Sequence, residues 1–84
     1  MKKQIKDQIE KMVKVFNEEN ERRGMQSRYG VKSHSFKRGN YAISITFNHT
    51  FFSCDFERLF ECIAENNLNF FMSHYSSETI LNLQ

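Results

Sequence analysis

The sequence has no tryptophan and no proline, only two cysteines, and no long apolar run anywhere in its 84 residues. Cys54 and Cys62 are eight positions apart. On one helix that spacing is roughly 12 Å of rise, too far for a disulfide, which favours a reducing, cytoplasmic compartment. No window approaches the ~20 apolar residues of a membrane span, and the lysine-rich start lacks a signal peptide's apolar core.

An excess of acidic residues is also missing, which argues against a mimic of DNA. The net charge is +2, but its distribution is uneven. Residues 1–38 hold eleven Lys or Arg and five Asp or Glu, whereas residues 39–84 hold one Arg and five acids. Such asymmetry can steer a charged partner, and it is equally the pattern of solvated helix and turn charges.

Motifs of known chemistry are missing as well. The sequence has no glycine-rich phosphate loop, no dinucleotide fingerprint and no paired-carboxylate motif. His34, His49 and His74 lack the close C-x₂-C or H-x₃-H pairs of metal sites, and His49 with Cys54 is the nearest combination. A Cys–His nucleophile would need a deeper pocket than so small a domain usually has. We therefore expect no enzyme activity, no cofactor and no metal.

Residues 2–23 have the pattern of an amphipathic helix. Its apolar stripe, spaced at i, i+4, i+7, i+8 and i+11, is Ile5, Ile9, Met12, Val13 and Phe16. Gly24 stands where a helix C-terminal glycine belongs. With nine Phe and three Tyr in the chain, aromatic side chains can supply most of the core, although some can instead stay exposed and bind.

Residues 32–47 predict a β-hairpin, because polar and apolar residues alternate around Gly39-Asn40. A two-residue turn there pairs Phe36 with Ile43 and His34 with Ile45. The face expected to pack on the helices is Phe36, Tyr41, Ile43, Ile45 and Phe47. The opposite face is Ser33, Ser35, Ala42, Ser44 and Thr46. A slip of one residue would invert one strand and bury its hydroxyls.

Residues 53–67 predict a second helix, capped by Ser53 or Asp55. Residues 68–75 fit a strand or a helix, and the alternation of Leu68, Phe70 and Met72 favours the strand. Residues 78–84 then predict a short last helix, with Ser76 or Ser77 as its cap. The predicted fold is one α+β domain spanning 1–84. Its order is α-β-β-α-β-α, with an antiparallel hairpin or sheet and helices packed on one face.

Two surfaces are candidates for binding. Glu57, Glu61 and Glu65 recur four residues apart beside Arg58, and this acidic row could face a basic groove on a partner protein. Cations and tyrosines could instead gather where the first helix meets the hairpin and bind RNA: Arg22, Arg23, Arg28, Lys32, Lys37, Arg38, Tyr29 and Tyr41. Self-association through the first helix or a free sheet edge is also allowed.

The whole chain resembles the small proteins with which phages and mobile elements block host defences, anti-CRISPR proteins in particular. The resemblance rests on a compact α+β domain, a Lys/Asn/Phe/Ile-rich composition and the absence of enzyme motifs. It implies stoichiometric binding to a large, basic, RNA-loaded nuclease, for example an RNA-targeting (type VI) effector. We therefore expect a protein-binding inhibitor or interaction module, and RNA binding is the alternative.

Overall fold

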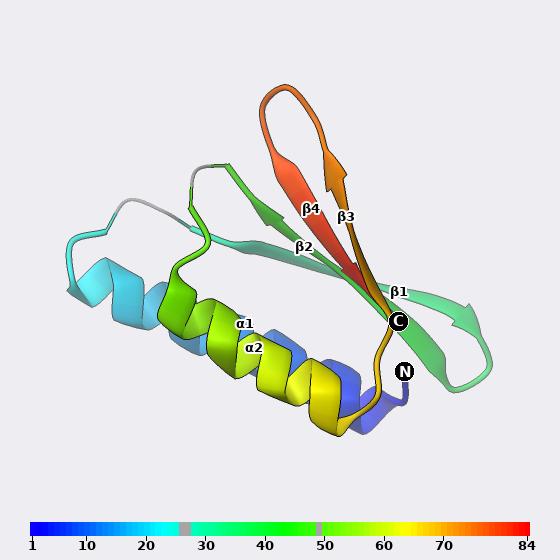
Figure 1. Ribbon diagram of the computed structural model, residues 1–84. Coiled ribbons are helices and arrows are strands. Elements are labelled where there is room, and N and C mark those ends of the chain that lie inside the picture. Colours follow the sequence, from blue (N-terminus) through cyan, green and yellow to red (C-terminus); the bar gives the residue numbers. More distant parts are fainter. Residues whose placement is uncertain (26–27, 49) are drawn as a thin grey trace.

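A computed structural model describes residues 1–25, 28–48 and 50–84. The elements, in chain order, are α1 (Lys3–Arg22), β1 (Gly30–Lys37), β2 (Asn40–Phe47), α2 (Ser53–Glu65), β3 (Phe70–His74) and β4 (Thr79–Leu83). The strands form one antiparallel sheet in the order β1-β2-β4-β3, and both helices lie on one face of it (Figure 1). The α+β class and the one-sided packing are confirmed. Neither helix is long and apolar enough to cross a bilayer, within the residues described.

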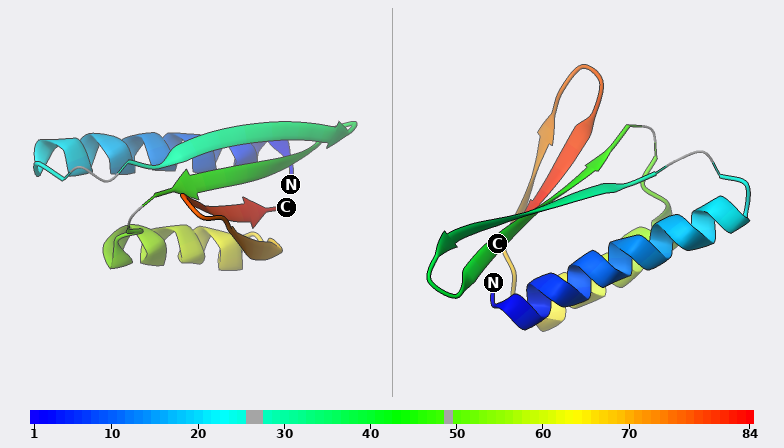
Figure 2. Two further views of the ribbon diagram at one scale, coloured as in Figure 1. Left: turned by 90° about the horizontal axis from the view of Figure 1, so that it is seen from above. Right: turned by 180° about the vertical axis from the view of Figure 1, so that it is seen from behind.

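The sheet contains a split β-α-β unit. Strands β2 and β3 both pair antiparallel with β4, so they run parallel to each other on its two sides, and α2 connects them. The chain ends meet near the β1–β2 turn, as both views in Figure 2 show. There the Met1 amino group donates a hydrogen bond of 2.8 Å to the carbonyl oxygen of Tyr41. The strand order leaves β1 and β3 as the two edges of the sheet.

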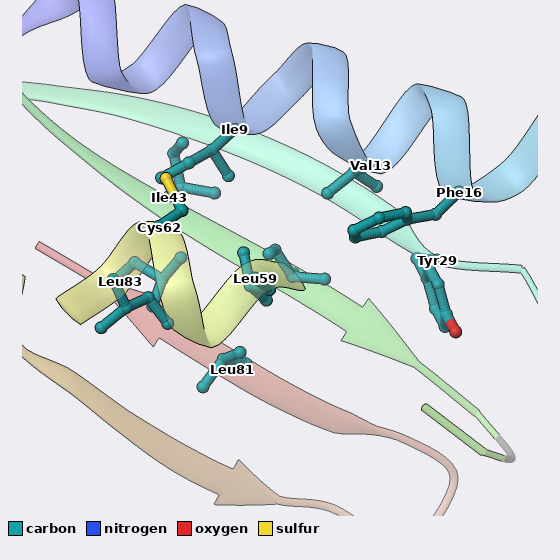
Figure 3. Packing of buried hydrophobic residues seen from close by; sticks show 11 residues of the cluster. Ile9, Val13, Phe16, Tyr29, Ile43, Leu59, Cys62, Leu81 and Leu83 are labelled. Atoms are coloured by element: carbon teal, nitrogen blue, oxygen red, sulfur yellow. The ribbon is translucent and has the colours of Figure 1, made fainter. Parts of the chain in front are cut away.

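The core lies between the sheet and the helices (Figure 3). Its apolar members are Ile9, Val13 and Phe16 of α1, Leu59, Cys62 and Ile63 of α2, Ile43, Ile45, Leu81 and Leu83 of the sheet, and Tyr29. The predicted stripe of the first helix is therefore confirmed. A mainly phenylalanine interior is not, because Phe16 is the one phenylalanine among these members. Aliphatic side chains from the two central strands fill the middle of the core instead.

The predicted hairpin forms, but its register is wrong. The turn is Arg38-Gly39, where Gly39 supplies a φ of 75°, and the register shifts between Ser35 and Lys37. Ser33 therefore lies opposite Ile43, on the side that faces the helices. Phe36 is 55% exposed, whereas the hydroxyl of Ser33 is buried and has no hydrogen-bond partner among the described residues. The predicted face of β2, with Ile43 and Ile45 inward, is confirmed.

The predicted last helix is a strand, β4. Leu81 and Leu83 are buried, whereas Ile80 and Asn82 between and beside them are only half-buried, which is the two-residue period of a strand. The segment inserts between β2 and β3 and pairs with both. The expected strand at 68–75 is confirmed as β3, and it gives β4 one of its two partners.

Candidate functional site

The charge asymmetry of the sequence becomes a separation in space. Residues 1–38, which carry the basic excess, form α1 and β1, and α1 packs against β1 and β2. The acidic residues of the second half lie on α2 and in the loop before β4, with β3 at the far edge of the sheet (Figure 2). The molecule therefore has a basic α1–β1 half and an acidic α2–β3 half.

The acidic row on α2 faces solvent. Glu57, Glu61 and Glu65 are exposed, and no cation lies within 4 Å of their carboxylates in the described part of the chain. Arg58 points toward α1 instead, where its Nη1 lies 3.4 Å from Oε2 of Glu19. This exposed pair contributes less than about 1 kcal/mol to stability. The three glutamates therefore remain available to a cationic partner.

An apolar groove of about 610 Å³ lies beside this row, between the start of α2 and the strands. Its lining residues are Phe47, Thr50, Phe51, Ser53, Phe56, Glu57 and Met72. Because most of the wall is aromatic or aliphatic and Glu57 stands among the lining residues, the groove suits an apolar side chain next to a cation. A second groove, of about 560 Å³, lies between α1 and β1, and its lining includes charged side chains of both signs beside Val13, Tyr29 and Val31.

Five phenylalanine rings connect this groove to the edge of the sheet. Neighbouring centroids lie 5.2 Å apart for Phe47 and Phe51, 5.4 Å for Phe51 and Phe56, 4.7 Å for Phe56 and Phe60, and 4.9 Å for Phe60 and Phe70. Such ring pairs contribute roughly 0.5–1.5 kcal/mol each beyond area burial. The row ends on β3, so the α2–β3 half presents apolar surface together with its acidic residues.

The two sheet edges differ in chemistry. Strand β1 carries Lys32 and Lys37 and a register shift, which are features that prevent an edge strand from pairing further. Strand β3 has no Lys, Arg, Asp or Glu, and its Phe70, Phe71 and Met72 are exposed. The β3 edge therefore lacks the features that oppose further strand pairing, and we call it the open edge. The sequence did suggest a free edge, but nothing in it indicated which strand would lie there.

The basic cluster predicted for RNA is not brought together. Arg22 and Arg23 end α1 and Arg28 precedes β1, whereas Lys37 and Arg38 lie at the β1–β2 turn (Figure 1). Strand β1 separates the two groups by roughly 23 Å, with Lys32 between them.

The two tyrosines of that cluster are poorly placed to stack on bases. Tyr29 is only 2% exposed, because its ring stacks on Phe51 at 4.3 Å and meets the edge of Phe16. Tyr41 is half-buried, with Nζ of Lys6 5.1 Å from its ring centroid. Tyr29 is therefore a core residue and not a base-stacking residue.

Asp55 is the centre of a buried polar network that the sequence did not predict. Its side chain is not the helix cap, since Phe52 precedes α2 without a side-chain cap. Oδ2 of Asp55 accepts a hydrogen bond of 2.8 Å from the Tyr29 hydroxyl and one of 3.1 Å from Nδ2 of Asn20. The backbone N–H of Phe52 donates a hydrogen bond of 3.0 Å to the hydroxyl oxygen of Tyr29. The network therefore joins α1, the segment before β1 and the start of α2.

The Tyr29 hydroxyl gives this network a pH dependence. Burial raises the pKa of Tyr29 from 10.0 to about 12, the Phe52 amide opposes that rise, and Asp55 adds to it. Above pH 10 the unfolded chain therefore loses this proton before the folded protein does, and stability falls. At pH 11 we expect a loss of about 1 kcal/mol relative to pH 9, measured by urea unfolding. In Tyr29→Phe this part of the alkaline loss should disappear, and an unchanged pH slope would contradict the assignment.

The described residues form no cluster that could hold a metal ion. No three His, Cys, Asp or Glu side chains there gather as they would around a metal. His49, half of the nearest pair in the sequence, lies outside those residues. Both cysteines are free: Cys54 is exposed, whereas Cys62 is buried, and this burial raises the pKa of the Cys62 thiol.

Comparison with protein-family models, with curated proteins and with solved structures found no match.

Proposed function

We propose that this protein is a non-catalytic interaction module that binds a basic partner protein through its α2 surface. We define the α2 surface as Glu57, Glu61 and Glu65 together with the groove that Glu57 helps to line. One observation carries the proposal: exposed carboxylates without a nearby cation stand beside an apolar groove, on the acidic half of a molecule whose other half is basic. Interfaces combine apolar anchors with a charged rim in this way.

The two parts of the surface have different tasks. Carboxylates near the rim attract cations at a distance and raise the rate of association, without adding much to affinity. Most of the affinity comes from an apolar side chain that fills the part of the groove lined by Phe47, Phe51 and Phe56. The partner segment should therefore present an apolar residue next to lysine or arginine. The resemblance to anti-CRISPR proteins suggests one partner of this chemistry, the basic channel of a nuclease.

The test compares partners captured from extract of the source cell with and without nuclease treatment. Wild-type protein is set against Glu57→Lys/Glu61→Lys, and a captured protein is then purified and titrated directly. We expect the double substitution to weaken binding about tenfold or more, because cations would then oppose cations. Affinity for the wild type should also fall as salt is added.

The matched control is Lys3→Glu/Lys11→Glu, which reverses two exposed charges on α1 and should leave this affinity within about twofold. Equal binding by all three proteins would exclude the α2 surface as the binding site. Loss of every captured protein on nuclease treatment would favour the alternative, RNA binding. That alternative has less support, because the cations lie in two groups and Tyr29 is buried.

A further inference from the structure

The open edge of β3 presents unpaired backbone groups at alternate residues. Asn69 and Gln84 exchange both of their backbone hydrogen bonds, at 3.2 and 2.9 Å, and the Tyr75 amide donates to Glu78 at 2.8 Å. In an antiparallel pair such bonded positions alternate, so Phe71 and Ser73 bond to β4. Phe70, Met72 and His74 therefore direct their N–H and C=O groups away from β4, toward the open edge.

These outward positions are symmetric about Met72. If a second β3 lies antiparallel with Met72 opposite Met72, then Phe70 of each copy faces His74 of the other. All three outward residues then exchange N–H···O bonds with the second copy. On the other face of the sheet, Phe71 lies opposite Ser73 of the second copy. The strand is thus complementary to itself in backbone and in side chains.

We propose that two copies of this chain pair through their β3 edges, with Met72 on the twofold axis, to form a continuous eight-stranded sheet. Closed twofold pairing of identical surfaces is the commonest form of protein assembly. Pairing would cover Phe70, Phe71 and Met72, which are three of the exposed large apolar residues described. It would also occupy the edge that, unlike β1, carries no charge to prevent pairing.

A second copy fits this edge better than a strand of a charged partner. Residues 66–77 contain no Lys, Arg, Asp or Glu, so the strand has nothing with which to select a charged segment. The glutamates of the two α2 helices would lie on the same face of the joined sheet. Their repulsion is largely screened beyond about 8 Å at physiological salt. Added salt should therefore strengthen the dimer, whereas it should weaken binding of a basic partner.

A stable dimer must bury enough area on each copy around β3. A standard interface covers about 800 Å² per partner, roughly a seventh of the 5777 Å² that this molecule exposes. The five residues of β3 alone are a short edge. The ring of Phe60, which contacts Phe70, and the exposed Tyr75 after the strand extend the apolar area beyond these five residues.

The first experiment is sedimentation equilibrium of purified protein over a range of concentrations. The test variant is Met72→Lys and the matched control is Val31→Lys, because these side chains are 40% and 38% exposed on the two opposite edges. We expect a concentration-dependent dimer, weakened at least about 30-fold by Met72→Lys, which places two cations at the axis. Val31→Lys should change the dimer less than about twofold. A wild type that stays monomeric to millimolar concentration would overturn the proposal, as would an unaffected Met72→Lys dimer.

The second experiment tests the axis itself. At a concentration just sufficient for the wild type to dimerise, Met72→Lys and Met72→Glu should each be mainly monomeric, and an equimolar mixture should recover dimer because the two charges then face each other. If the mixture stays monomeric, the twofold register at Met72 is wrong. Circular dichroism spectra that match wild type establish that each variant is folded.

Amide hydrogen exchange gives an independent readout. The amides of Phe70, Met72 and His74 should exchange quickly at low concentration and become protected as the dimer forms. Those of Phe71 and Ser73 should be protected throughout. Dimerisation without protection of the first three would exclude strand pairing. All three experiments use the protein alone, so this proposal and the proposed binding of a basic partner can fail independently.

Discussion

Replacing Asp55 with alanine should lower the free energy of unfolding by about 3–5 kcal/mol. Asp55 is 1% exposed, and its Oδ2 is the acceptor for both Tyr29 and Asn20, which are themselves buried. Without Asp55, the buried donors of Tyr29 and Asn20 lose their acceptor, and no water replaces it. A domain of this length has roughly 4–13 kcal/mol of stability in total, so the variant should be close to unfolding. Urea unfolding followed by circular dichroism measures the loss.

Two further variants separate the network from a general effect of substitution. Tyr29→Phe removes one donor and should cost about 1.5–3 kcal/mol, while Asp55 keeps its bond from Asn20. The double variant should then cost less than the sum of the two single losses, since both act on the same hydrogen bond. Additive losses would show that the Tyr29–Asp55 contact contributes nothing specific. An Asp55→Ala loss below about 1 kcal/mol would contradict the network as a whole.

Replacing Leu81 with alanine should cost about 2–5 kcal/mol, the second large effect. Leu81 is fully buried in the centre of the sheet, opposite Ile45 of β2 and Met72 of β3. The cavity left there cannot collapse easily, because strands flank it on both sides. Thermal or urea unfolding of the purified variant gives the value.

The matched control is the neighbouring residue, Ile80. It is only half-buried and points to the face of the sheet away from the helices, so Ile80→Ala should cost less than about 1.5 kcal/mol. A large loss at Leu81 with a small loss at Ile80 is the signature of a strand. Comparable losses at both positions would contradict the placement of β4, because in a helix the two side chains would lie only 100° apart.

The elements with a strong local period could be predicted from the sequence. The stripe from Ile5 to Phe16 and the alternation of β2 each extend over enough residues to fix the type of element. The register of the hairpin could not be predicted, because it depends on a shift at Phe36 that no local signal marks. Residues 79–83 were misread as a helix because five residues are too few to distinguish the two periods.

The candidate site divides in the same way. The row Glu57, Glu61 and Glu65 follows from spacing on a single helix, so the sequence was enough to find it. The groove beside it joins residues of β2, α2 and β3, and the Asp55 network joins positions 20, 29 and 55. Contacts between distant parts of the chain depend on strand order, which no short stretch of sequence specifies. In the sequence, nothing about the polar residues of the Asp55 network distinguishes them from ordinary cap and turn residues.

The lysines and the register shift of β1 limit the number of copies that can join one sheet. A sheet that adds strands at both edges grows without limit into a fibre. Here the outer strands of a pair would both be β1, which carries Lys32 and Lys37 and a register shift. Because both β3 edges of the dimer would already be paired, a third copy could not add to the sheet in the same way, and assembly would stop at two. The uncharged, aromatic β3 segment would then not lead to amyloid.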